Sequence, residues 1–150
     1  MTREQFQQVI KFAVEKEEEA ATLYETAGQV AVTPLAKKTF AEFVAEEKKH
    51  KRMLLELKPE SLGTQASAPV ADLKISDYLV DIEFRPDMSY QDMLILAMKR
   101  EEQSVRLYTD LRRQTGDAEL QRLFDLLTEE EKRHKLRLET IYDDEILTEN

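Results

Sequence analysis

The 150-residue sequence contains no cysteine, and it has only three glycines and four prolines. Without cysteine the chain can form neither disulfides nor thiolate zinc sites, and cysteine redox chemistry is excluded. The scarcity of glycine and proline leaves few points at which a helix would break. Together with abundant Glu, Lys, Leu, Ala and Gln, this composition predicts long helices rather than a sheet.

The sequence also lacks features that several classes of protein need. No segment approaches the roughly 20 apolar residues of a membrane span, and the N-terminal MTREQFQQ is not a signal peptide. The net charge of −9 opposes binding to nucleic acid, which requires a basic face. With 41% hydrophobic residues, the chain can still bury a core. We expect one domain over residues 1–150, cytoplasmic, with neither a membrane nor a nucleic acid as its partner.

Helix signals predict two helical hairpins. The first helix begins at a capping box formed by Thr2 and Gln5. The second begins at Thr33, which precedes Pro34 at the first helical position, and it runs to about Leu57. These two helices form the first predicted hairpin.

The second predicted hairpin starts at Ser89, the N-cap of the third helix. Gly116 is expected at the position after that helix's C-cap, and Asp117 is expected to cap the fourth helix. Residues 59–88 form a long connection with a possible short helix in ISDYLVDI. Two hairpins joined by a single long crossover predict an all-α, ferritin-like four-helix bundle.

The two halves of the sequence align when one is shifted by 84 positions, so that EEKKHK at 46–51 meets EEKRHK at 130–135. This register indicates a pseudo-twofold bundle, in which a site on the axis would take equal parts from each half. The matched pairs include Glu17 with Glu101, Tyr24 with Tyr108, Phe40 with Phe124, Glu47 with Glu131, and His50 with His134.

In each predicted helix, apolar residues recur every three or four positions and form a stripe on the face that should point into the core. In the middle of each stripe, a glutamate, or a glutamate and a histidine, takes the place of the apolar residues. In the second helix, the two stripe positions between Phe43 and Leu54 are Glu47 and His50. Buried carboxylates must take up protons or bind cations, because desolvation and mutual repulsion are costly. The residues that interrupt the four stripes are Glu17, Glu47, His50, Glu101, Glu131 and His134.

These six residues predict a dimetal site. Glu-x-x-His places both side chains on one helical face, and two such motifs with one Glu from each of two other helices form a known dimetal-carboxylate arrangement. Two divalent ions would neutralise four glutamates. Oxygen and nitrogen ligands without sulfur suit iron or manganese, with zinc also possible.

Two further groups of residues have less specific patterns. Tyr24 and Tyr108 lie on the stripes, and two interpretations stay open: core packing, or a hydroxyl that donates to a ligand carboxylate. Glutamates off the stripes are expected to be solvated, as most Glu/Lys runs are. The latter are Glu18, Glu19, Glu46, Glu102, Glu129 and Glu130.

The motifs EEEAATLY and EEKKH, repeated as REEQSVRLY and EEEKRH, resemble those of the rubrerythrin branch of the ferritin-like superfamily. The resemblance covers nearly the whole chain and implies a four-helix diiron protein, often a homodimer, that reduces hydrogen peroxide to water. It carries the family's metal ligands to Glu17, Glu47, His50, Glu101, Glu131 and His134, and its tyrosines to Tyr24 and Tyr108.

The sequence departs from the family pattern in two ways. Full rubrerythrins add a rubredoxin domain with two Cys-x-x-Cys motifs, so here a separate rubredoxin-like donor is implied. Many also have an extra glutamate one turn after the third-helix ligand, where this chain has Ser104. We therefore expect a diiron oxidoreductase that reduces hydrogen peroxide or O₂ with electrons from a separate donor protein. Two alternatives stay open: a ferroxidase or iron-handling protein, and a non-catalytic metal-binding sensory or interaction module.

Overall fold

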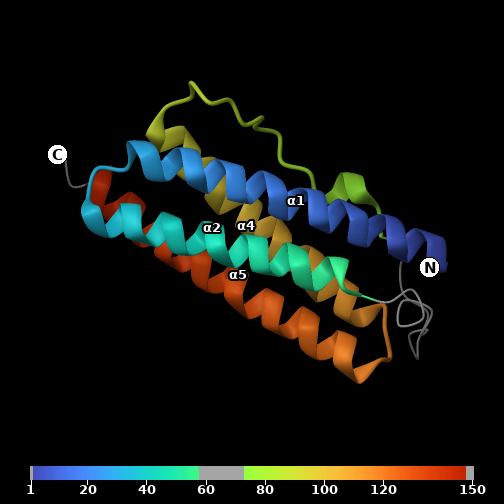
Figure 1. The fold of residues 1–150 in the computed structure, drawn as a ribbon. Helices are drawn as coiled ribbons and strands as arrows, with labels where there is room; N and C mark the ends of the chain where they lie inside the picture. Colours follow the sequence, from blue (N-terminus) through green and yellow to red (C-terminus); the bar gives the residue numbers. More distant parts are fainter. Residues whose placement is uncertain (1, 58–72, 148–150) are drawn as a thin grey trace.

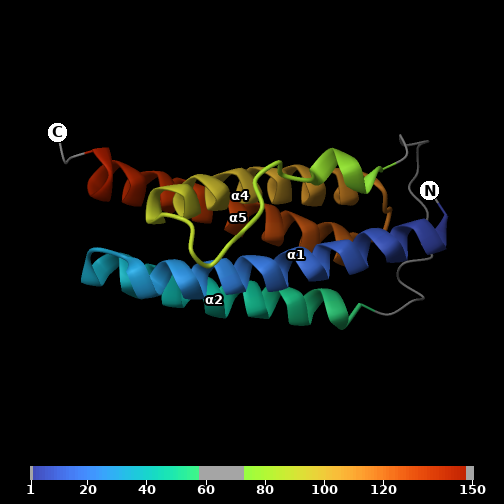
Figure 2. The ribbon, with the colours of Figure 1, turned by 90° about the horizontal axis from the view of Figure 1, so that it is seen from above.

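The computed structural model describes residues 2–57 and 73–147. Its elements are α1 (Arg3–Val30), α2 (Pro34–Leu55), the 3₁₀ helix η1 (Ile75–Tyr78), α4 (Tyr90–Arg113) and α5 (Ala118–Glu145). Helices α1 and α2 form one antiparallel layer, and α4 and α5 form the second, packed face to face on the first (Figures 1 and 2). The predicted all-α four-helix bundle is confirmed.

The described part of the connection between the hairpins, residues 73–89, runs along the bundle from η1 to the start of α4 (Figure 1). Part of the predicted crossover, residues 59–72, lies outside the described residues. In the part described, Tyr78 is buried and donates a hydrogen bond of 2.6 Å to Asp110 of α4. The Arg106 guanidinium also lies 5.7 Å from the centre of the Tyr78 ring. These contacts attach η1 to α4.

The predicted helix starts are confirmed. Thr2 and Gln5 form a reciprocal capping box, with bonds of 2.8 and 3.1 Å. Thr33 Oγ1 accepts from the third backbone N–H that follows, and Pro34 fills the first helical position. Ser89 and Asp117 cap α4 and α5 in the same way. Each cap satisfies an N–H group that the helix itself leaves unpaired.

One predicted helix end is wrong. Helix α2 ends at Leu55, close to the predicted end at about Leu57, but α4 ends at Arg113 with Gln114 as its C-cap, so Gly116 is not the residue after the cap. Gln114 stays in the right-handed helical region, and its N–H closes a tight last turn onto the Leu111 carbonyl at 3.0 Å. Such a turn needs no left-handed residue, and none of the described glycines has a positive φ.

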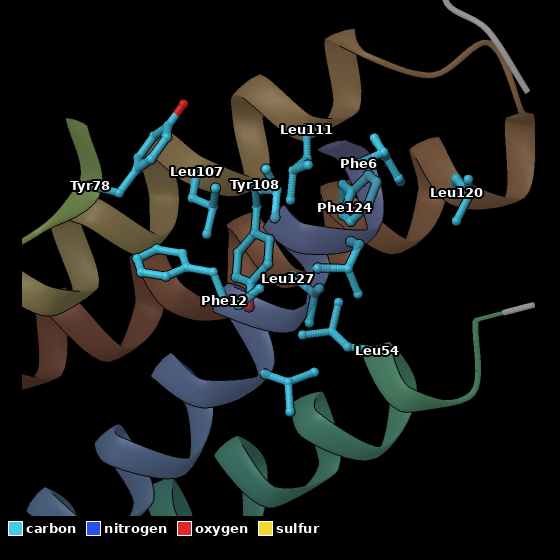
Figure 3. Packing of buried hydrophobic residues seen from close by; sticks show 14 residues of the cluster. Phe6, Phe12, Leu54, Tyr78, Leu107, Tyr108, Leu111, Leu120, Phe124 and Leu127 are labelled. Atoms are coloured by element: carbon cyan, nitrogen blue, oxygen red, sulfur yellow. The ribbon is translucent and has the colours of Figure 1, made fainter. Parts of the chain in front are cut away.

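Buried apolar side chains form two clusters along the bundle, one on each side of its middle. Figure 3 shows the first, around Phe6, Leu54, Tyr108, Phe124 and Leu127. Burying each such side chain contributes about 1.5–3 kcal/mol, which offsets the cost of a polar layer between the clusters. The second cluster includes Tyr24, Phe40, Phe43, Leu94 and Leu138.

Candidate metal centre

The polar layer contains all six residues that interrupt the predicted stripes. Each of the four long helices contributes a glutamate at its middle, and α2 and α5 each add a histidine one turn later. None of the six is more than 3% exposed, so bulk water does not solvate them. They are Glu17, Glu47, His50, Glu101, Glu131 and His134.

The six side chains form two overlapping groups. Within each group, one potential ligand atom per residue lies within 4.8 Å of the others. The first group contains Glu17, Glu47, His50 and Glu131, and the second contains Glu47, Glu101, Glu131 and His134. Glu47 and Glu131 belong to both groups, and each histidine belongs to one.

Each of the six residues has one buried side-chain atom that completes no hydrogen bond of regular geometry in the described structure, although His50 Nδ1 lies 2.9 Å from Glu131 Oε1 and His134 Nδ1 lies 2.8 Å from Glu47 Oε1. These atoms are the Nδ1 atoms of the two histidines, Oε2 of Glu17 and Glu101, and Oε1 of Glu47 and Glu131. An unsatisfied buried polar group costs about 1–3 kcal/mol, so six in one layer indicate a missing ligand. Cations between the two groups would satisfy all of them, and the donor set therefore fits metal ions.

The shared glutamates are poorly placed to be ionised without a cation. Burial, followed by repulsion from the other carboxylates, raises the pKa of Glu47 and of Glu131 well above the usual value. For Glu101 burial also acts to raise the pKa, but close contacts with Glu131 and with His134, whose Nδ1 lies 3.6 Å away, outweigh it, and the net shift is downward. Without metal ions, bound protons therefore neutralise part of the negative charge of these carboxylates.

The histidines are held in their charged form by these carboxylates. For His50 burial acts to lower the pKa, but close contacts of Nδ1 with the carboxylates of Glu131 and Glu17, at 2.9 and 3.5 Å, outweigh it and raise the pKa to about 11. The pKa of His134 is raised for the same kind of reason, with Glu101 as the principal partner. Because a metal would need Nδ1 unprotonated, metal binding should release protons from the site.

These pKa shifts predict how the metal-free protein responds to pH. A group whose pKa is higher in the folded than in the unfolded state adds to the free energy of unfolding. This contribution is complete at pH values below the unfolded-state pKa, and it is lost as the pH rises through the folded-state pKa. This holds for Glu47 and Glu131, whose unfolded-state pKa is about 4.3, and for His50, whose unfolded-state pKa is about 6.5. Only Glu101, whose pKa is lowered, acts in the opposite direction.

We therefore expect the free energy of unfolding of the metal-free protein to fall between about pH 5 and about pH 9. Denaturant unfolding in the presence of a chelator, followed by circular dichroism across this range, measures it. A metal-free protein that became steadily more stable as pH rose would contradict the charge distribution described above.

The outer nitrogen of each histidine is held by a carboxylate from the opposite hairpin. His50 Nε2 on α2 hydrogen-bonds the Glu130 carboxylate on α5, and His134 Nε2 on α5 hydrogen-bonds the Glu46 carboxylate on α2. A hydrogen bond at Nε2 leaves Nδ1 as the nitrogen that faces the centre. The two contacts are related by the 84-residue repeat.

The expectation that Glu46 and Glu130 belong to a solvated face is thus wrong. Their side chains are 43% and 15% exposed, respectively, and each reaches a histidine across the helix interface. Each immediately precedes a stripe residue in the sequence and lies at the edge of the buried helix face. At that position the apolar pattern does not distinguish a partly buried residue from an exposed one. Their shared register with the histidines, 84 residues apart, is the signal that could have found them.

Removing one of these carboxylates should weaken metal binding without removing a ligand. Glu130→Ala leaves His50 Nε2 without its acceptor, and we expect a loss of about 10–100-fold in metal affinity. Glu46→Ala should do the same through His134. Competition with a chromophoric chelator measures the affinity. The control is Glu129→Ala, an exposed neighbour, and an equal loss in that variant would show a non-specific effect.

Both on-stripe tyrosines donate to a carboxylate of the site. Tyr24 on α1 hydrogen-bonds Glu101 on α4, and Tyr108 on α4 hydrogen-bonds Glu17 on α1, so each bond crosses between hairpins. Burial, followed by the nearest glutamate, raises the pKa of both phenols, which therefore stay protonated donors. This geometry favours the second of the two interpretations of these tyrosines.

Fold and site together define the class of the protein. A four-helix bundle in which two helices each present a Glu and two each present Glu-x-x-His has the arrangement of the ferritin-like dimetal-carboxylate proteins. Comparison with family models gives a match to Rubrerythrin over residues 8–142, and the chain belongs to the rubrerythrin family. No curated protein matches the chain significantly. Within the described residues, no helix is long and apolar enough to cross a membrane.

Proposed function

We propose that the protein is a non-haem diiron oxidoreductase that reduces hydrogen peroxide with electrons from a separate donor protein. The observation that supports this most directly is the set of six unsatisfied atoms in two overlapping groups. In this arrangement Glu17 and His50 would bind one iron, Glu101 and His134 the other, and Glu47 and Glu131 both. Manganese or zinc fits the same donors.

The residues around the site have separable roles. A bound pair of reduced irons would supply the two electrons that peroxide needs, and would stabilise developing negative charge. Glu46 and Glu130 keep the histidine Nδ1 atoms directed inward, and Tyr24 and Tyr108 orient two carboxylates. The two apolar clusters keep bulk water away from the reacting atoms.

A small cavity beside the site supports a small oxidant as the substrate. It has a volume of about 60 Å³ and reaches Glu101 between α1, α4 and the segment after η1. This space admits water-sized molecules, which is consistent with hydrogen peroxide or O₂ as the oxidant. Ser104 also lines it, at the position where many relatives are implied to have an extra glutamate. Its walls include Phe12, Ala20, Tyr78, Leu79, Glu101 and Ser104.

The electron donor is proposed to be rubredoxin-like and to lie outside this domain, because none of these 150 residues is a cysteine that could bind a rubredoxin iron. Each turnover converts one hydrogen peroxide, two protons and two electrons into two waters. Homodimerisation and a cytoplasmic location remain predictions from the family resemblance and the sequence.

Anaerobic reconstitution with Fe(II), followed by stopped-flow oxidation, tests the proposal. We expect about two irons per chain and stoichiometric oxidation by hydrogen peroxide that is much faster than oxidation by O₂. Fast oxidation by O₂ with iron accumulated or released would instead indicate a ferroxidase. Failure to bind iron would refute the diiron assignment, and a bound pair inert to both oxidants would indicate a structural or sensory metal site.

A further inference from the structure

Two rows of three aromatic rings lead away from the polar layer, and the 84-residue repeat relates them ring by ring. The tyrosine-ended row is Tyr24, Phe40 and Tyr90. The phenylalanine-ended row is Tyr108, Phe124 and Phe6, whose rings appear in Figure 3. Each row starts at a tyrosine that hydrogen-bonds a glutamate of the site.

The two rows have the same internal geometry. Tyr24 stacks on Phe40 with ring centroids 6.0 Å apart, and Phe40 meets Tyr90 edge-on at 6.4 Å. In the other row the stacked contact and the edge contact are both 6.4 Å. The bundle therefore contains the same three-ring path twice. The surroundings of the inner tyrosines differ, because Tyr24 also contacts Phe43 at 5.1 Å, and the position that the repeat relates to Phe43 is Leu127. The outer ends differ in whether they carry an oxidisable residue.

The outer ends differ in their chemistry. Tyr90 is half-buried, and its hydroxyl donates to the buried carboxylate of Glu145. Glu145 is itself held by the backbone N–H and hydroxyl of Thr33, at 2.9 and 2.8 Å. Phe6 has no hydroxyl and is 5% exposed. Only the tyrosine-ended row thus places a phenol beside a proton acceptor near the surface.

We propose that the tyrosine-ended row is a one-electron route between the candidate metal centre and the surface, with Tyr90 as its outer redox residue and Glu145 as its proton acceptor. The proposal deepens the proposed function, on which its role in turnover rests. The route would operate when hydrogen peroxide exceeds the supply of donor electrons, and it would carry the surplus oxidising equivalent away from the ligand side chains.

Each hydrogen peroxide that meets no donor electrons takes up two electrons and two protons and becomes two waters, so Tyr90 is oxidised twice for each one, and the protons come from solvent. The O–H bond of Tyr90 breaks, its proton passes to the Glu145 carboxylate, and its electron passes through Phe40 and Tyr24 to a centre oxidised by hydrogen peroxide. A one-electron reductant in solution, such as a thiol, then returns an electron to the Tyr90 phenoxyl radical. Glu145 returns the proton, and the O–H bond forms again.

Phenylalanine is much harder to oxidise than tyrosine, so Phe40 acts only as a bridge between two tyrosines. In the second row, an oxidation that reaches Tyr108 cannot move further outward, because Phe124 and Phe6 are not readily oxidised. The repeat therefore supplies an internal control: Tyr24 and Tyr108 each donate to a glutamate of the site, but only Tyr24 continues to an oxidisable residue.

The first arm of the test mixes reduced, iron-loaded protein with excess hydrogen peroxide and a nitroso spin trap, and then maps the labelled peptides by mass spectrometry. We expect a label on Tyr90. Tyr24→Phe should abolish this label, whereas Tyr108→Phe, which loses the equivalent hydrogen bond to the site, should retain it. Equal labelling of Tyr90 in both variants would overturn the route.

The second arm uses protein loaded with zinc, which is redox-inert, and a photogenerated ruthenium oxidant in solution. Tyr142 is the internal reference, since it is also half-buried but its hydroxyl accepts from Gln91 at 2.9 Å. We expect preferential labelling of Tyr90, and loss of that preference in Glu145→Gln with labelling of Tyr142 unchanged. Circular dichroism and metal content establish that each variant is folded.

The two arms separate failure of the route from failure of the proposed function. If peroxide does not oxidise the bound iron, the proposed function fails, and the zinc arm alone decides whether Tyr90 and Glu145 form a redox unit. If peroxide oxidises the iron but Tyr90 stays unlabelled, the route is wrong although the diiron function stands. Loss of label in Tyr24→Phe together with Glu145-dependent labelling in zinc protein would support the whole route.

Discussion

Replacing both shared glutamates with glutamine, as Glu47→Gln with Glu131→Gln, should stabilise the metal-free protein and abolish its stabilisation by metal. Both carboxylates are 1% exposed, and neighbouring carboxylates disfavour their charged forms. A carboxyl group whose pKa is raised by folding lowers the stability at neutral pH by about 1.4 kcal/mol for each pKa unit, and glutamine avoids this cost because it does not titrate. Each glutamine can still accept a hydrogen bond from a histidine, because His50 Nδ1 lies 2.9 Å from Glu131 and His134 Nδ1 lies 2.8 Å from Glu47. The same change removes the two residues common to both metal groups.

The metal-dependent part of this effect is expected to be larger. A ligand that binds only the folded state at about 1,000 times its dissociation constant stabilises by about 4 kcal/mol. Two ions bound to the wild-type protein would together contribute about twice that amount. Guanidinium unfolding under anaerobic conditions, with and without Fe(II), measures both parts. Zinc provides a redox-inert comparison.

The control for this prediction is Glu18→Gln with Glu102→Gln, which removes the same charge from a repeat-related pair of exposed residues. We expect it to change stability by less than about 0.5 kcal/mol in either state. If the double glutamine variant were less stable than wild type without metal, the polar layer would be a satisfied structural network. That result would argue against a polar layer whose carboxylates need bound cations.

Much of the fold could be predicted from the sequence because helical periodicity and capping are local properties. Thr2 with Gln5, and Thr33 with Pro34, mark helix starts within a few residues of the chain. The 84-residue repeat then relates the two hairpins without reference to any distant contact. The helix ends were less predictable, since Gln114 closes α4 through a tight turn that its sequence does not specify.

The candidate site was predictable for the same reason, and its surroundings were not. The six central residues can be identified from the sequence because they are polar at positions where the helical pattern otherwise places apolar, core-facing residues. Glu46 and Glu130 create no such conflict, and their role depends on a contact with the opposite hairpin. Glu145 is similar, since its partners Thr33 and Tyr90 are distant in sequence. Residues whose function depends on pairing across elements require the tertiary structure.

Removing a single histidine should convert the candidate dimetal site into a site for one metal. His50 belongs only to the first group and His134 only to the second, so His50→Ala and His134→Ala should each reduce binding from about two metal ions per chain to about one. The double variant should lose both. Metal analysis after desalting, supported by calorimetric titration, gives the stoichiometry.

Glu47→Ala is the informative comparison, because Glu47 is common to both groups and its loss should impair both metal ions at once. Circular dichroism of each metal-free variant establishes that the bundle still folds, since a buried truncation also leaves a cavity. If His50→Ala lost both metals, or Glu47→Ala lost only one, the division into two overlapping groups would be incorrect.

The same variants separate metal binding from peroxide reduction. Reduction of hydrogen peroxide to water takes two electrons, and one ferrous iron that passes to the ferric state supplies only one. His50→Ala loaded with a single iron should therefore bind metal, yet lose the stoichiometric two-electron reaction that the wild-type pair is proposed to perform. If this variant still reduced peroxide at the wild-type rate, the second iron would be dispensable, and the reason for building the site twice would have to lie outside this reaction.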